Sequence, residues 1–257
     1  MKKVVIDKKY KANSSLVSFL TDLPTLFVAE GEMLHNERNI IKEFTIDDIN
    51  FVVKGYKRPL FIQRVVYSFF RKTKAKRAYN NAKKIRSRGV DTPREMAFIE
   101  VWKGGLFADG YLATEKNSNP DIAGLLINKG EDFCKELAEA FACFVVELHL
   151  KGILHHDLNS TNVLFTKENG HYHFSLIDIN RMKVLPKGSV PSKDECLKNL
   201  NRFTWEYPLF EYVLSIYSEK RNWNVSETLE RALRLKKRFE TRRRRTKSFF
   251  RIFKCNK

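Results

Sequence analysis

A long amphipathic helix that runs directly into a polar loop is the strongest pattern in this sequence. Glu131 to Leu150 carries apolar residues at helical spacing, and Gly152 predicts that the helix ends there. The next segment, His155 to Asn162, holds an acid and an amide within one tight loop. This order predicts a folded body in which a packed helix precedes a polar loop.

A short hairpin is predicted directly after this loop. Two apolar runs, Asn162 to Phe165 and His173 to Ile177, flank the turn Glu168-Asn169-Gly170. Asp178 follows the second run. The second strand of such a hairpin would therefore deliver the Asp178 carboxylate to a defined place.

The loop spacing H-x-D-x-x-x-x-N is typical of a kinase catalytic loop. In this interpretation Asp157 orients an acceptor hydroxyl and accepts its proton. The carbonyl oxygen of Asn162 and the carboxylate of Asp178 would hold a Mg²⁺ ion that bridges the phosphates of ATP. The first histidine of the motif, His155, is interpreted as a structural residue that braces the loop.

The first part of the chain predicts an antiparallel meander. Lys54 ends a strand-like run and resembles the strand lysine that neutralises the α- and β-phosphates of ATP in kinases. Only Gly31 is available for a phosphate-covering loop. The strands are predicted at Val4 to Ile6, Thr25 to Ala29, Asn39 to Phe44 and Ile49 to Lys54.

Helical spacing follows Pro59, and strands return at Glu95 to Trp102 and at Gly110 to Glu115. The helix predicted from Thr73 to Arg88 contains no glutamate for Lys54, and Asn80 or Asn81 is its nearest polar candidate. The backbone near Glu115 and Asn117 is predicted to contact adenine.

These elements predict an α+β, two-lobed, protein-kinase-like fold with ATP between the lobes. The N-terminal lobe, residues 1–115, would contain an antiparallel sheet with a helix. Residues 116–240 would form a mainly helical C-terminal lobe that carries the catalytic loop. Residues 241–257 would form a basic, aromatic tail.

The charge of the chain is concentrated in two blocks. The net charge is +18, and Lys57 to Arg88 holds 12 Lys and Arg with no acid, while Arg231 to Lys257 holds 13 against Glu240 alone. Such blocks predict a polyanionic partner, which charge alone does not identify. Four scattered cysteines, no 18-residue apolar window and no signal-peptide pattern predict a cytosolic protein.

The sequence resembles the lipopolysaccharide core kinases, the family of Kdo and heptose kinases that phosphorylate an inner-core sugar on lipid A. The catalytic loop and the run Leu176 to Met182 carry the most specific part of this resemblance. Three further segments support it: Lys54 to Pro59, Thr73 to Tyr79 and Gly89 to Pro93.

The resemblance implies ATP and Mg²⁺ as cofactors and a sugar hydroxyl of a lipid A–core oligosaccharide as acceptor. It also implies work at the cytoplasmic face of the inner membrane of a Gram-negative bacterium. Similar sequences usually have a glutamate where this chain has Asn80. The two basic blocks would contact the anionic membrane surface, and Phe249 to Lys254 has a composition suited to a membrane interface.

Two alternatives remain open at this point. An atypical protein Ser/Thr kinase would share the loop, although Asn159 stands where such kinases usually have lysine and no A-P-E motif follows. A binding-only pseudokinase is suggested by the missing helix glutamate but opposed by the intact Asp157, Asn162 and Asp178. Nucleic acid is a less favoured partner because no recognition module is present, and the oligomeric state is not predicted.

Overall fold

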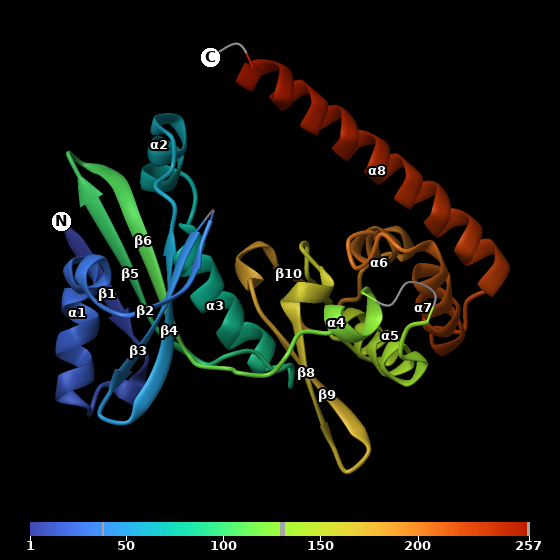
Figure 1. Cartoon of the computed structure of the whole chain (residues 1–257), viewed down its shortest axis with the longest axis horizontal. Helices are drawn as coiled ribbons and strands as arrows, with labels where there is room; N and C mark the ends of the chain where they lie inside the picture. Colours follow the sequence, from blue (N-terminus) through green and yellow to red (C-terminus); the bar gives the residue numbers. More distant parts are fainter. Residues whose placement is uncertain (38, 129–131, 256–257) are drawn as a thin grey trace. The chain divides into compact units, whose positions relative to one another are not determined.

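We describe the chain from a computed structural model, in which the backbone is described for residues 1–37, 39–128 and 132–255 and side chains are described up to residue 246. The chain forms two compact units (Figure 1). The first unit comprises Met1–Asn119 and Ser175–Met182, and the second comprises Pro120–Phe174 and Lys183–Lys257. Residues 175–182 therefore belong to the first unit although residues of the second unit precede and follow them in sequence.

A six-stranded antiparallel sheet forms the centre of the first unit, with strand order β1-β5-β6-β4-β3-β2. At the β3–β4 turn, Asp47 and Asp48 both have positive φ, as a tight two-residue hairpin requires. The strands are β1 (Lys2–Ile6), β2 (Glu32–Asn36), β3 (Asn39–Ile46), β4 (Ile49–Tyr56), β5 (Glu95–Lys103) and β6 (Leu106–Glu115).

The predicted meander is only partly correct. Strands β2, β3 and β4 are consecutive neighbours, but β1 pairs with β5 at the far edge of the sheet. The strand predicted at Thr25 to Ala29 is wrong, because these residues form the end of helix α1 (Ser14–Ala29). Asn13 caps this helix, and Leu16, Leu20 and Leu23 bury its inner face at helical spacing. The helical period over sixteen residues outweighs the local strand propensity of Thr25 to Ala29.

The helical spacing predicted after Pro59 corresponds to two helices, α2 (Phe61–Phe69) and α3 (Lys74–Arg86). Helix α3 packs against β5 and β6 and begins at its cap residue Thr73. The Thr73 hydroxyl lies 2.5 Å from the buried carboxylate of Glu100 on β5. The buried face of α3 consists of Ala75, Ala78, Tyr79, Ala82 and Ile85.

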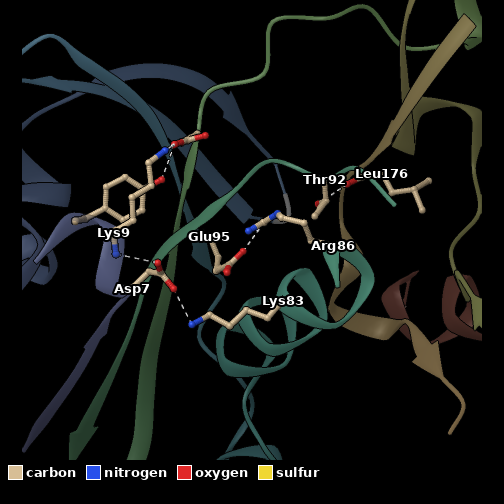
Figure 2. Close-up of polar contacts among 9 residues, drawn as sticks. Asp7, Lys9, Lys83, Arg86, Thr92, Glu95 and Leu176 are labelled. Carbon is tan, nitrogen blue, oxygen red and sulfur yellow. Dashed lines mark hydrogen bonds and ion pairs between the residues drawn. The ribbon is translucent and has the colours of Figure 1, made fainter. Parts of the chain in front are cut away.

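Ion pairs fix the other end of α3 to the sheet (Figure 2). Lys83 Nζ lies 2.7 Å from Asp7 Oδ2, just after β1, and Arg86 lies 2.5 Å from the buried carboxylate of Glu95 on β5. Burial alone would raise the pKa of Asp7, but Lys83 and the backbone N–H of Lys9 hold that pKa below its usual value. Helix α3 is therefore held against the sheet near both of its ends.

The returning segment Ser175–Met182 is tied to the loop that follows α3. The Leu176 N–H donates to Asp91 O at 2.9 Å, and the Thr92 hydroxyl donates to Leu176 O at 2.7 Å (Figure 2). The segment ends in the 3₁₀ turn η3 (Ile179–Arg181), which packs on α3. This attachment brings Asp178 into the first unit.

The second unit is mainly helical, as predicted. Helices α5 and α7 make its main helix-to-helix contact. The predicted start of the long helix at Glu131 lies outside the described residues, and α5 is described from Lys135. The helices are α4 (Ala123–Leu126), α5 (Lys135–Leu150), α6 (Lys193–Leu200), α7 (Tyr207–Lys220) and α8 (Val225–Cys255).

Short strands surround the catalytic-loop segment. Strands β7 (Ile153–Leu154) and β10 (Lys183–Val184) pair, and β8 (Val163–Glu168) and β9 (His171–Leu176) form the predicted hairpin. Its turn residues Asn169 and Gly170 both have positive φ, which confirms the tight turn expected from the sequence.

Within the described residues, no helix is long and apolar enough to cross a membrane. Helix α8 has 31 residues but is strongly basic, and Arg242 to Arg245 are exposed. The interfacial role predicted for Phe249 to Lys254 falls on side chains outside the described part of the chain.

Candidate active site

Lys54 lies on β4, the third strand in the β2–β3–β4 meander, and faces a carboxylate of the same unit. Its Nζ atom lies 2.9 Å from Asp178 Oδ1. The two side chains are only 18% and 30% exposed, so their attraction is less screened than that of a surface pair. Lys54 and Asp178, 124 positions apart in sequence, are thus brought together as expected for residues that serve one nucleotide.

Asp178 is held by its backbone as well as by Lys54. Its φ and ψ of 52° and 43° are left-handed, a conformation that few non-glycine residues adopt. Asn180 Nδ2 donates to Asp178 Oδ1 at 2.5 Å. The turn therefore presents the carboxylate in one orientation, a form of backbone strain that is common at functional sites.

The partner that the sequence suggested for Lys54 on helix α3 is not the one observed in the structure. Asn81 Nδ2 donates to Ile179 O at 2.8 Å, so this amide supports η3 rather than the lysine. Lys54 makes its ion pair with Asp178 instead. The helix acts on Lys54 only indirectly, through the turn that carries Asp178.

Two further cofactor residues were predicted in this unit. Gly31 joins α1 to β2 with φ +88°, and a Cβ atom there would come within 2.5 Å of the Phe44 ring, so packing already requires glycine. The Glu115 carboxylate accepts hydrogen bonds from Lys9 at 2.6 Å and Tyr10 at 2.5 Å, and its backbone N–H donates to Arg94 O. Contacts of Gly31 with phosphate and of Glu115 with adenine stay predictions.

The catalytic loop of the second unit is closed by its own hydrogen bonds. Asn162 Nδ2 donates to the backbone oxygen of Asp157 at 2.9 Å, and the Asp157 N–H donates to His155 Nδ1 at 3.2 Å. His155 is 1% exposed, and its bracing role stays a prediction. The Asp157 carboxylate lies 2.8 Å from Arg202 Nη1.

A buried polar network, which the sequence did not reveal, supports this loop from below. Asn199 Nδ2 donates to His155 O at 2.7 Å, and Asn199 Oδ1 lies 3.0 Å from His149 Nε2. His149 Nδ1 in turn lies 2.7 Å from the Tyr217 hydroxyl. His149 and Tyr217 are fully buried, so each polar atom needs such a partner.

The network assigns one tautomer to His149. The amide oxygen of Asn199 is an acceptor, so His149 Nε2 carries the proton and donates to it, and Nδ1 accepts from Tyr217. Burial lowers the pKa of His149 to about 4, so the ring is neutral at pH 7. Its position in an apolar stretch of α5 was the only sequence signal for this role.

Arg202 was also missed by the sequence analysis. It lies between α6 and α7, 45 residues from Asp157, and its guanidinium packs 5.2 Å from the ring of Phe239 on α8. No local motif marks such a residue, because the contact depends on how the helices of the second unit pack. Arg202 is therefore a positioning candidate for the Asp157 carboxylate.

Each unit supplies one of the two predicted Mg²⁺ ligands, Asp178 in the first unit and Asn162 in the second. Asp178 has a carboxylate, and Asn162 has an amide whose nitrogen donates to Asp157 O and whose oxygen is an acceptor. Mg²⁺ prefers such oxygen ligands and completes its shell with phosphates and water. The two predicted ligands are therefore chemically suited to Mg²⁺–ATP.

Comparisons with known proteins address the family. The profile of the Lipopolysaccharide kinase (Kdo/WaaP) family matches residues 27–224, which is more than half of the chain. No curated protein matches the chain. A solved structure described as "WaaP in complex with acyl carrier protein" is similar, with a TM-score of 0.62 and 16% identity over 93% of this chain and 97% of that chain. This structural likeness confirms the kinase-like α+β fold. The profile match shows that the chain belongs to the lipopolysaccharide kinase (Kdo/WaaP) family.

Proposed function

We propose that this chain transfers the γ-phosphoryl group of ATP to a sugar hydroxyl, Kdo or heptose, in the lipopolysaccharide inner core on lipid A. In the first unit, Lys54 would neutralise ATP phosphates and Asp178 would bind Mg²⁺. In the second unit, Asp157 would orient the acceptor hydroxyl and accept its proton, and Asn162 would be the other Mg²⁺ ligand. Bound Mg²⁺–ATP supplies the phosphoryl group and charge neutralisation.

The contact between Lys54 Nζ and Asp178 Oδ1 at 2.9 Å carries this proposal. A chain that had lost nucleotide chemistry would have no need to keep a strand lysine paired with a carboxylate on a left-handed turn. This observation disfavours the binding-only alternative despite the missing helix glutamate. The family assignment favours a saccharide acceptor over a protein acceptor.

Label transfer tests the proposal. Labelled γ-phosphate of Mg²⁺–ATP is offered to purified lipid A carrying its inner core, with the native chain and with Asp157→Asn. We expect Asp157→Asn to lower the rate by roughly 10²–10⁴-fold, the usual contribution of a positioned base. The exposed Asp132 provides the matched control, because Asp132→Asn makes the same chemical change in the same unit and should retain the native rate.

The alternatives predict other outcomes of the same assay. Nucleotide binding without transfer to any core sugar would exclude the proposed acceptor, and transfer to an added protein would favour the protein-kinase alternative. A native chain that binds no Mg²⁺–ATP would instead be a pseudokinase.

We also propose that the chain binds peripherally to an anionic membrane surface through α2. Phe61, Ile62, Phe69 and Phe70 on and beside this helix are 66–82% exposed, and no residue of α2 is buried. Exposed cations flank the helix on both sides: Lys57, Arg58, Arg71 and Lys72. Aromatic and aliphatic side chains beside lysine and arginine are typical of helices that lie in a lipid interface.

A further inference from the structure

A cavity of about 650 Å³ lies in the first unit beside α2, α3 and η3. We call it the cation pocket because four of its lining side chains are Arg71, Lys74, Arg77 and Arg181. Tyr67 and Asn180 line it as well. All of these residues belong to the first unit.

The cation pocket concentrates positive charge, because four of its lining side chains are cations. Among the described residues, no acidic side chain lines it. In the same part of the chain, neither Arg71 nor Arg77 forms an ion pair, and the buried Nε atom of Arg77 has no hydrogen-bond partner. Burial, together with the charge of Arg71, lowers the pKa of Arg77. A bound anion would compensate these charges.

The chemistry of the lining selects the kind of anion. Guanidinium groups bind phosphate and carboxylate through paired N–H donors, and such charge-assisted hydrogen bonds are stronger than neutral ones. A volume of about 650 Å³ is far larger than one phosphate group and is typical of a site for a small organic molecule. The pocket is therefore suited to an anionic group that belongs to a larger ligand.

Asn180 connects this pocket to the predicted reaction site. Its side chain lines the pocket and donates to Asp178 Oδ1 at 2.5 Å, and Asp178 pairs with Lys54. A ligand in the pocket would thus lie one side chain away from the carboxylate proposed to bind Mg²⁺.

We propose that the cation pocket binds a phosphate or carboxylate group of the acceptor saccharide and so positions the acceptor for transfer. This inference rests on the proposed function, since it names the part of the acceptor that the first unit recognises. The nucleotide phosphates are the other source of such an anion. In the proposed function they are bound by Lys54 and by the Mg²⁺ ion that Asp178 would hold, and not by the cation pocket.

Binding of inorganic phosphate to the full chain tests the pocket directly, without any transfer. We expect Arg77→Gln and Arg71→Gln each to weaken phosphate binding about tenfold or more, as loss of a charge-assisted hydrogen bond predicts. Lys84→Gln is the matched control, because Lys84 is an exposed cation on α3 outside the pocket and its loss should change affinity less than twofold. Because Arg71 is exposed, its variant keeps the test valid if Arg77→Gln fails to fold.

A second arm separates the two sources of the anion. If the acceptor group occupies the pocket, a non-hydrolysable Mg²⁺–ATP analogue leaves phosphate affinity unchanged. Arg77→Gln then raises KM for the lipid A–core acceptor and leaves KM for Mg²⁺–ATP unchanged. Competition between phosphate and the analogue, with a higher KM for ATP in the variant, would assign the pocket to the nucleotide and overturn the inference.

The outcomes also separate this inference from the proposed function. Transfer to the core sugar with phosphate affinity unaffected by both arginine variants would overturn the pocket and leave the kinase intact. Arginine-dependent phosphate binding by a chain that transfers nothing to any core sugar would support the anion site and contradict the proposed acceptor.

Discussion

His149 illustrates what a single residue contributes to this molecule. It lies on α5, does not belong to the catalytic motif, and supports the loop through Asn199 and the backbone oxygen of His155. The motif residues Asp157 and Asn162 could be predicted because their spacing is local. The supporting residues could not, because Asn199 and Tyr217 reach His149 only after α5, α6 and α7 pack.

We expect the buried ring of His149 to make folding stability depend on pH. Its folded pKa of about 4 lies below the ordinary 6.5, so its contribution is complete above pH 6.5 and is lost as the pH falls towards 4. The loss amounts to about 3 kcal/mol over that window. Chemical unfolding of the native chain and of His149→Gln at several pH values measures it as the difference between the two curves.

The exposed His173 provides the control, since His173→Gln should leave the pH profile of the native chain unchanged. Parallel profiles for the native chain and His149→Gln would show that the ring is not buried in its neutral form.

At the scale of elements, helix α3 is the link between the sheet and the turn that carries Asp178. The sequence predicted this helix within one or two residues but not its function, because the expected glutamate is absent and Lys54 meets Asp178 directly. Thr25 to Ala29 was misassigned for the opposite reason, since a short β-prone run hid the end of a longer helix. Element types followed from periodicity, whereas their attachments followed from packing.

We predict that Asn81→Ala impairs catalysis through the position of η3. Loss of the hydrogen bond to Ile179 O should cost about 1 kcal/mol of folding stability. A looser turn should also lower kcat by roughly tenfold, the change that corresponds to about 1.4 kcal/mol in the barrier. Kinetics of label transfer and thermal unfolding measure both effects.

Asn80 provides a matched control on the same helix, because Asn80→Ala makes the same change at a residue with no hydrogen bond to η3. Equal losses of kcat in Asn81→Ala and Asn80→Ala would mean that the helix acts on Lys54 directly. An Asn80→Glu variant with a higher kcat than the native chain would mean the same.

At the scale of the whole molecule, surface composition is the basis of the proposed membrane contact. The basic blocks were evident in the sequence, but their surroundings were not. The first block supplies part of the lining of the cation pocket and also the exposed apolar residues around α2, and a charge count cannot distinguish these two features.

We predict that replacing Phe61 and Phe70 together by Asp abolishes most binding to vesicles rich in phosphatidylglycerol. Loss of two interfacial aromatic side chains should lower the partition coefficient on the order of 100-fold. Co-sedimentation with such vesicles measures the effect. Val28 is 81% exposed on α1, and Val28→Asp is the control that should bind like the native chain.

Unchanged sedimentation of the double variant would move the membrane contact to another surface, such as Arg242 to Arg245 on α8.

The most direct test of the central claim is to determine where the transferred phosphate is attached. Lipid A carrying its inner core is incubated with the native chain and Mg²⁺–ATP, and the product is cleaved into its sugars and analysed by mass spectrometry. The account predicts one added phosphomonoester on a Kdo or heptose residue, absent with Asp157→Asn. New phosphate on the lipid A glucosamines, on protein, or only in solution would contradict it.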